Sequence, residues 1–427
     1  MDTPNLNSKH WLRVFAPIWA GQVFSLLGSG LVQFALVWWM TQETGSAAVL
    51  ASASFIALLP QVFLSPFAGA LVDRWNRRLV MIFADGIVAL TTLGLVALFY
   101  SGHIQLWHVY AALFIRSLGG AFHWPATQAS TSLMVPQQHL ARVAGANQAL
   151  HGLISIGAPP LGAVLMSLLP IFQVLAIDIV TAGLAILPLL FVAIPQPMRS
   201  DAQSVTPRTV LADVRAGLRY VVSWRGVFLL LIMVSLLNFL LSPGSTFMPL
   251  LVTRHFNGDA LQLGWLQSAW GFGAVAGGLL LSAWGGFRRK IFTAMLGLIG
   301  IGVGVLVVGV APTWGYWIAW GGMLVAGIMN PLTNGPLFAL LQAKIEPEIQ
   351  GRVFTLVNSL AGAMMPLGML IAAPVAEWLG LQSWYLLGGV MCLLMGVVGL
   401  IARPIATLDE QMPGGALTVT QPAAASD

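Results

Sequence analysis

Charged residues are scarce in this chain: Asp, Glu, Lys and Arg together make up only 8% of its 427 residues. Soluble domains carry about 25% charged residues, whereas here hydrophobic residues reach 58%. Cysteine is rarer still, because Cys392 is the single one, which excludes a disulfide framework and a cysteine-based metal site. The composition therefore predicts a protein embedded in a membrane.

Several functional signals are also missing. The sequence has no Gly-rich phosphate-binding loop and no histidine with metal-ligand spacing to a carboxylate, so we expect no metal, no cofactor and no ATP-driven step. Nothing in the distribution of basic residues calls for nucleic acid. The polar stretch 1–10 lacks the short apolar region and cleavage site of a signal peptide, so we expect a retained cytoplasmic tail.

Long hydrophobic runs are what the chain has in abundance. A helix needs about 20 apolar residues to cross a bilayer. Twelve such segments are predicted, at 12–40, 48–71, 79–100, 107–131, 143–168, 173–194, 226–250, 262–284, 291–311, 316–341, 353–377 and 384–402. We therefore expect an all-α integral membrane protein with twelve transmembrane helices.

The spans divide into two sets of six. A polar segment, 195–225, separates the sixth span from the seventh, and the residues at 210–226 have the spacing of an amphipathic helix on the membrane surface. The predicted organisation is an N-terminal six-helix bundle at 1–194, a cytoplasmic linker at 195–225, a C-terminal six-helix bundle at 226–402 and a cytoplasmic tail at 403–427.

The positions of Lys and Arg predict the orientation. If the N-terminus is cytoplasmic, the inner segments hold all but two of the 19 Lys and Arg residues. The exceptions are Arg254 in an outer loop and Arg116 inside a span. Because cytoplasmic loops are enriched in Lys and Arg, we expect a multi-pass protein of the inner cell membrane with both termini in the cytoplasm.

The two halves also resemble each other in sequence. In 121–150 and in 327–360, a Pro-bearing helix end is followed by a short loop, and then by Arg-Val, which we expect to open the next helix. Arg142 and Arg352 hold these positions, and Asn147 and Asn358 follow them. A parallel repeat of six spans indicates a transporter with a central site between the halves.

Polar side chains recur on one face of five predicted spans: the first, fourth, fifth, seventh and tenth. Residues at i, i+3, i+4 and i+7 share a helix face, and a polar stripe must face protein or water. We expect these spans to surround the pathway and the nearly apolar ninth and twelfth to lie outside. Hydrogen bonding between helices is the alternative for any single residue. The substrate-cavity candidates are Gln22, Gln33, Asn147, Asn238, Asn330 and Asn334.

Ionisable residues inside predicted spans are candidates for ion coupling, because a charge at the bilayer centre costs about 2.5–3.5 kcal/mol. Arg116 attracts an anionic group, or else is held by backbone carbonyls. Asp85 lies near the inner face, where it can also pair with the basic loop before it. Asp178 lies on a helix that we expect to be peripheral. His123 and His151 are the intramembrane histidines, and a histidine titrates near physiological pH; helix–helix hydrogen bonding is their alternative.

The stretch GALVDRWNRR, at 69–78, concentrates charge between the second and third spans. It resembles the signature of the major facilitator superfamily at this place, with Asn76 where glycine is usual. The residues on motif positions are Gly69, Asp73, Arg74, Arg77 and Arg78. A carboxylate here can accept hydrogen bonds from a helix N-terminus or an arginine. We expect this loop, the latch, to close the inner gate in the outward-open state; the alternative is that its arginines only fix orientation.

Two further motifs resemble the same family. The sequence IRSLGG, at 115–120, is similar to its fourth-span motif, which implies a role in proton coupling for Arg116. The sequence GAPPLGA, at 157–163, is a degenerate form of the antiporter motif, because alanines replace two of its glycines. In the second half, the counterpart of the latch, at 278–290, has Ser282 at the position that Asp73 holds in the latch.

The likeness is closest to the macrolide-efflux and siderophore-export branch of drug exporters, on the segments 31–51, 81–90 and 350–368, and it spans most of 12–402. It implies a proton-coupled secondary transporter, working by alternating access as a monomer, that exports an amphipathic organic solute such as a macrolide-like drug or a siderophore. A solute importer or lysolipid carrier of the same fold is the alternative. We expect no enzyme, because the single conceivable catalytic pair, His151 with Asp178, has no nucleophile.

Overall fold

The computed structural model describes residues 11–72, 75–192, 194, 215, 218–345 and 347–410. Within these ranges the regular elements are all helices. The long ones are α1 (Trp11–Thr44), α2 (Ala47–Val72), α3 (Arg77–Tyr100), α4 (Leu106–Met134), α5 (Gln137–Leu168), α6 (Ile171–Phe191), α8 (Arg225–Leu250), α9 (Ala260–Trp284), α10 (Lys290–Val310), α11 (Tyr316–Lys344), α12 (Pro347–Leu379) and α13 (Gln382–Ile401). The π-helix η1 (Leu251–His255) extends α8, and the short α14 (Arg403–Ala406) follows α13.

The predicted all-α membrane fold is confirmed. Eleven of the described helices are both long and apolar enough to cross a membrane. The remaining long helix is α4, with 29 residues, whose hydropathy is lowered by polar side chains such as Arg116 and His123. Because α4 packs against both α2 and α3, it runs among the spanning helices as the twelfth member of the set.

Two helices begin earlier than the sequence predicts. We expected α5 to start near 143 and α12 near 353, but they start at Gln137 and Pro347. Pro136 is the N-cap of α5, and Pro347 is the first residue of α12. Proline suits the first turn of a helix, where its missing N–H group has no intrahelical partner. The Arg142 position therefore lies inside α5 and does not open it.

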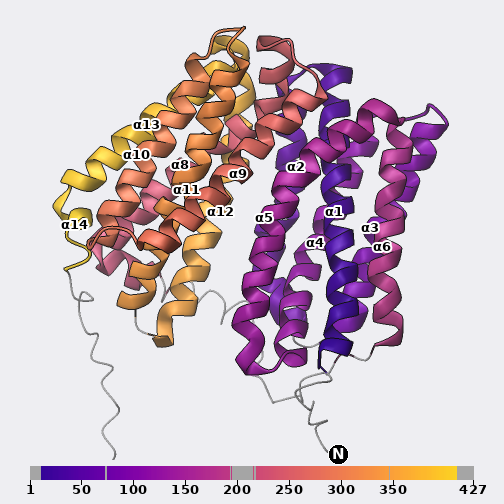
Figure 1. Cartoon of the computed structure of the whole chain (residues 1–427), viewed down its shortest axis with the longest axis horizontal. Coiled ribbons are helices and arrows are strands. Elements are labelled where there is room, and N and C mark those ends of the chain that lie inside the picture. The colour runs from indigo at the N-terminus through magenta and orange to yellow at the C-terminus, as the bar shows by residue number, and fades with distance from the viewer. Residues whose placement is uncertain are drawn as a thin grey trace, which may run out of the picture.

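The long helices form two bundles, α1–α6 and α8–α13, which lie side by side (Figure 1). In the first bundle α1 packs on α5 and α6, and α3 packs on α4 and α6. In the second, α10 packs on α11 and α13, and α8 packs on α12. We call the end of the molecule where α1 begins the terminal face, and the opposite end the far face.

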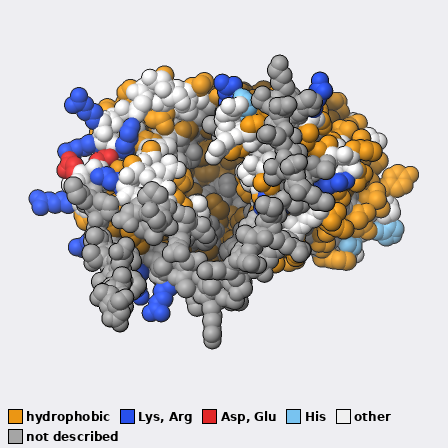
Figure 2. Space-filling model, turned by 90° about the horizontal axis from the view of Figure 1, so that it is seen from below, with side chains coloured by type: hydrophobic (Ala, Val, Ile, Leu, Met, Phe, Trp, Pro, Cys, Tyr) orange, Lys and Arg blue, Asp and Glu red, His pale blue; other side chains and the backbone are white. Residues whose placement is uncertain are grey.

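The two bundles are joined near the far face and separated near the terminal face. Helix α2 packs on α12, and α5 packs on α9. One buried hydrophobic cluster draws on both bundles, including Leu50 from the first turn of α2, Phe247 of α8 and Ala372 of α12. Seen from the terminal face, the surface is hollowed between the bundles, and Lys and Arg side chains lie mainly along the outer edge of this face (Figure 2). The molecule is thus open toward the terminal face.

Basic residues at the start of α3 hold the ends of neighbouring helices. Arg77 Nη1 donates to the carbonyl of Ala129 in α4, at 2.9 Å, and Arg78 Nη2 donates to the carbonyl of Leu190 in α6, at 2.6 Å. Leu190 lies in the last turn of α6, where carbonyls have no intrahelical partner and carry the negative end of the helix dipole, whereas Ala129 lies five residues before the end of α4. These arginines therefore tie α3 to α4 and α6 at the terminal face.

The second bundle achieves a similar junction with acidic residues that follow α14. The carboxylate of Asp409 accepts hydrogen bonds from the backbone N–H groups of Lys290 and Ile291, both at 3.1 Å, and so caps α10. Glu410 pairs with Arg289 at 2.7 Å. Ser282, where an aspartate might have stood, bonds only to the carbonyl of Gly278 in its own helix among the described residues.

The predicted amphipathic helix at 210–226 falls partly outside the described residues, which here are 215 and 218–226. Of these, 215 and 218–223 are helical, and 225–226 belong to α8. Val221 is buried there while Val222 is exposed, so this part has one face against protein and one face free.

Candidate functional site

A buried ion pair lies inside the first bundle. Arg116 Nη1 of α4 is 2.6 Å from Asp178 Oδ2 of α6, and their side chains are 11% and 1% exposed. Thr92 of α3 joins both partners: its hydroxyl donates to Asp178 Oδ2 at 2.9 Å and accepts from Arg116 Nη1 at 2.6 Å. Ser29 of α1 donates to Asp178 Oδ1 at 3.2 Å. Three helices thus supply donors to one carboxylate, which compensates for removing it from water.

Close approach of α1 to α6 makes this arrangement possible. A methyl group on Gly28 would lie 2.1 Å from Thr181 Oγ1 and 3.2 Å from Asp178 Cα, so the position requires glycine. Ser29 follows directly and reaches the carboxylate. The sequence predicts a peripheral helix for Asp178, whereas α6 turns this residue inward, where it is buried.

A second polar cluster lies on the same helices. Gln22 Nε2 of α1 donates to Asp85 Oδ2 of α3 at 3.2 Å, and His123 Nε2 of α4 lies 3.3 Å from Asp85 Oδ1. Asp85 and Gln22 are both buried. The sequence also allows the basic loop as a partner for Asp85. The described arginines of that loop, Arg77 and Arg78, instead bind helix carbonyls.

The two clusters are stacked in register along α1, α3 and α4. In each helix the two members are seven residues apart: Gln22 and Ser29, Asp85 and Thr92, Arg116 and His123. Seven residues are about two turns, or about 10.5 Å of rise, so both members face the same way. We call Ser29, Thr92, Arg116 and Asp178 the far layer, and Gln22, Asp85 and His123 the terminal layer.

The other candidates of the first bundle lie toward α5. Trp19 Nε1 donates to Asn147 Oδ1 at 2.6 Å. His151 packs edge-on against Trp124, with ring centroids 5.4 Å apart. No carboxylate among the described residues pairs with His151, so the conceivable catalytic pair with Asp178 is not formed.

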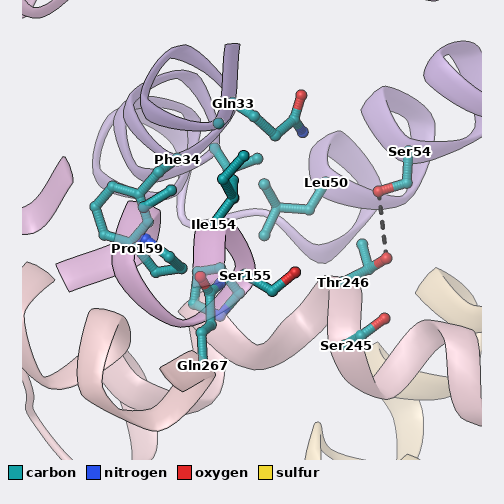
Figure 3. A pocket seen from close by; sticks show the side chains of 14 residues that line it. Gln33, Phe34, Leu50, Ser54, Ile154, Ser155, Pro159, Ser245, Thr246 and Gln267 are labelled. Atoms are coloured by element: carbon teal, nitrogen blue, oxygen red, sulfur yellow. Dashed lines mark hydrogen bonds between the residues drawn. The ribbon is translucent and has the colours of Figure 1, made fainter. Parts of the chain in front are cut away.

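A larger cavity, of about 400 Å³, lies between the two bundles near the far face. Figure 3 shows Ser54 of α2 and Thr246 of α8 meeting at its edge, where their hydroxyls are 3.2 Å apart. Its polar lining is uncharged and comes from both bundles: Gln33, Ser54, Ser155, Ser245, Thr246 and Gln267. Helices α2 and α9 contribute to this central cavity although their sequences gave no polar stripe that predicted it.

A further cavity, of about 290 Å³, lies within the second bundle among α8, α11 and α12. The candidates Asn238 and Asn334 line it together with Asn358, and we call it the asparagine pocket. Asn330 does not line it, but its carbonyl accepts a hydrogen bond from Asn334 Nδ2 at 3.2 Å. Helices α10 and α13, predicted to lie outside, contribute to none of these cavities.

The structure describes only part of the latch. Gly69 lies near the end of α2, while Asp73 and Arg74 are outside the described residues. Its gating role remains a prediction. In the described part of the chain, no group of three or more His, Cys, Asp and Glu residues is placed to hold a metal ion.

Known proteins resemble this chain both in sequence and in structure. Residues 18–363 and 244–420 match the sequence model of the Major Facilitator Superfamily. Macrolide efflux protein A of Streptococcus pyogenes is 33% identical over 400 residues, which cover 94% of this chain and 98% of that protein. Multidrug efflux pump Tap of Mycolicibacterium fortuitum is 26% identical over 93% of this chain and 96% of its own length. A solved bacterial homologue of the iron transporter ferroportin, in an inward-facing state, has a TM-score of 0.65 at 16% identity, over 90% of this chain and 99% of that one.

Proposed function

Because the chain belongs to the major facilitator superfamily, as its motifs predict, we propose that it is a proton-coupled exporter of an amphipathic organic solute. Its relatives at 33% identity are macrolide efflux proteins, which supports a macrolide-like drug as substrate. We place it in the inner cell membrane as a monomer, with the terminal face in the cytoplasm, since the basic residues favour that orientation. It works by alternating access, opening in turn to the terminal and far faces.

The observation that carries the proposal is the buried pair of Arg116 and Asp178. Arginine keeps its charge throughout, so a proton arriving at the far layer goes to the carboxylate. Protonation removes the charge that binds α6 to α4, and the far layer loses its strongest contact. A proton thereby changes the relative stability of two helix arrangements, which is what coupling requires.

The terminal layer gives the proton its next acceptors. Asp85 and His123 lie about two turns closer to the terminal face on the same helix faces. In the described arrangement Asp178 is paired with Arg116, which fits a carboxylate that has released its proton while the molecule is open to the cytoplasm. The membrane potential supplies about 2.3 kcal/mol per charge for each 100 mV.

The central cavity supports the choice of solute. Its lining combines Phe34, Leu50 and Ile154 with uncharged hydrogen-bonding groups, a composition typical of sites for amphipathic ligands. The buried charged residues of the two layers, Asp85, Arg116 and Asp178, lie elsewhere, inside the first bundle. We therefore assign proton binding to the two layers and solute binding to the cavity.

The test is transport by the purified protein in liposomes with an imposed pH gradient, with radiolabelled erythromycin as probe. Wild type should move erythromycin against its gradient, and Asp178→Asn should lose this by at least tenfold. Exchange of labelled for unlabelled erythromycin without a pH gradient should persist, because it needs no proton. The matched control is Asp259→Asn, at the N-cap of α9, where asparagine caps equally well.

Two outcomes would contradict the proposal. Gradient-driven transport that is unchanged in Asp178→Asn removes the coupling role of this residue. Uptake in the direction of proton flow would replace export with import, the alternative for this fold.

A further inference from the structure

Three helices each contribute one asparagine to the asparagine pocket, and the three carboxamides lie at a similar depth. Asn238 lies 13 residues after the start of α8, Asn358 lies 11 after the start of α12, and Asn334 lies 10 before the end of α11. At 1.5 Å per residue these positions are about 15–20 Å from the terminal ends of their helices. Because α8, α11 and α12 are 26, 29 and 33 residues long, the three amides lie at or on the terminal side of the middle of their helices.

These amides retain hydrogen-bonding capacity that the protein does not use. Asn334 Nδ2 donates to the carbonyl of Asn330, which leaves Asn334 Oδ1 available. Among the described residues, neither the Asn238 side chain nor the Asn358 side chain has a hydrogen-bond partner. Polar side chains at membrane depth normally pair with one another or line a site. A carboxamide offers both donors and acceptors, so it binds hydroxyl and carbonyl groups equally well.

The remaining walls are apolar and partly aromatic. Phe338 of α11 and Phe354 of α12 are stacked, with ring centroids 5.9 Å apart and planes at 30°, and both line the pocket. Leucine, valine, alanine and methionine side chains complete the lining, and none of the lining residues is charged. Asn334 and Asn358 are exposed and Asn238 is partly buried, so a charged group packed against the apolar walls would lose part of its water without gaining a counter-charge, which is unfavourable. The pocket therefore selects uncharged ligands.

We propose that the asparagine pocket is a second solute site, which receives an uncharged amphipathic ring bearing hydroxyl or carbonyl groups. It lies nearer the open terminal face than the central cavity, which lies near the closed far face. The two sites are successive stations on the export path, with the asparagine pocket as the station of entry. This assignment rests on the proposed function for the identity of the path, while the chemistry of the pocket stands on its own lining.

The test is equilibrium binding to the full-length protein in lipid nanodiscs, without any pH gradient. The probe is 4-nitrophenyl glucoside, an uncharged amphipathic ring with hydroxyl groups, and 4-nitrophenyl phosphate is its charged counterpart. Saturation-transfer NMR should detect the glucoside and not the phosphate. Asn238→Leu and Asn334→Leu should each weaken glucoside binding at least tenfold. Because no gradient is used, failure of proton coupling leaves this measurement intact.

Controls separate loss of the site from loss of the fold. Ser359→Ala changes the residue beside Asn358, which is exposed and does not line the pocket, and it should bind the glucoside as wild type does. Asn358→Asp keeps the size of the side chain and adds a charge, and it should weaken binding while thermal unfolding stays unchanged. Glucoside binding that is equal in Asn238→Leu, Asn334→Leu and Ser359→Ala would overturn the proposal. Binding of the phosphate that depends on the asparagines would overturn the selection for uncharged ligands.

Discussion

Thr92 is the residue through which the two charges of the far layer are linked. Its hydroxyl touches Asp178 and Arg116 at once, and it also lies 3.0 Å from the carbonyl of Val88 in its own helix. One small side chain on α3 therefore connects α4 and α6. The pair of charges is therefore held in position by a neutral group, the Thr92 hydroxyl, which is not ionisable.

Replacing Thr92 with valine should destabilise the protein while preserving the shape of the side chain. Hydrogen bonds to charged groups contribute about 1.5–3 kcal/mol each. We therefore expect the free energy of unfolding to decrease by about that amount. Thermal unfolding in detergent measures the change, and Thr92→Ser, which keeps the hydroxyl, should stay close to wild type. Thr91→Val is the matched control, because among the described residues the Thr91 hydroxyl bonds only to the carbonyl of Ile87 in its own helix. Equal losses in Thr91→Val and Thr92→Val would contradict the linking role.

At this scale the sequence identified the ionisable residues but not their partners. Arg116, Asp178, Asp85 and His123 were all candidates, because charge inside an apolar span stands out in any reading of the chain. Their pairing depends on how each helix is rotated about its axis, and one sequence does not state the rotation. Helix α6 is so apolar that the sequence predicts a peripheral position for the helix that carries Asp178. The signal in the sequence is the seven-residue spacing from Asp85 to Thr92 on α3, but Thr92 is uncharged and so does not stand out in an apolar span.

At the scale of elements, the contact between α5 and α9 holds the two bundles together near the far face. A methyl group on Gly264 would lie 2.9 Å from Pro160 Cα and 3.0 Å from the Pro159 carbonyl. One turn further along α9, Ser268 Oγ donates to the carbonyl of Ile156 at 2.6 Å. The backbones are in direct contact here, and a side chain at Gly264 has no room.

Gly264→Val should therefore push α9 away from α5 and favour the state that is open at the far face. Ala372, buried at the junction of the bundles, serves as a reporter when replaced by cysteine, since the native Cys392 is buried. A membrane-impermeant thiol reagent should label Ala372→Cys several-fold faster in the Gly264→Val background. Gly278→Val is the control, because a methyl group at Gly278 meets nothing within 4 Å. Labelling that is equally slow in both backgrounds would show that the contact does not keep the far face closed.

Helix positions were the most predictable feature of the fold. Hydrophobic length determines where a span lies, so most predicted boundaries fall within a few residues of the observed ones. The exceptions, α5 and α12, extend six residues further at their N-terminal ends. Their first two turns are polar because they lie outside the apolar part of the membrane, and polarity alone does not separate a helix from a loop. The cavity-lining helices were harder to predict, since α2 meets the central cavity through Leu50 and Ser54 and α9 through Gln267, and these residues form no polar stripe.

At the scale of the whole molecule, the bundles meet near one end and separate toward the other. The hydroxyls of Ser54 and Thr246 are 3.2 Å apart across the junction, one from each bundle. For the molecule to open at the far face, these two positions must part. A covalent link between them should hold the molecule open to the terminal face.

A disulfide formed in the double variant Ser54→Cys and Thr246→Cys should abolish transport, and a reductant should restore it. Erythromycin transport in liposomes, measured before and after reduction, checks this expectation. The single variants are the controls, since each lacks a partner thiol and Cys392 is buried. Full transport with the disulfide completely formed would mean that the far face opens without parting these residues.

The stacking of the two polar layers also limits how the chain can change length. One residue inserted between Asp85 and Thr92 would turn one layer about 100° away from the other. The same holds for α1 between Gln22 and Ser29, and for α4 between Arg116 and His123. We therefore expect an insertion inside these three helices to preserve both layers only if it amounts to whole turns in all of them together.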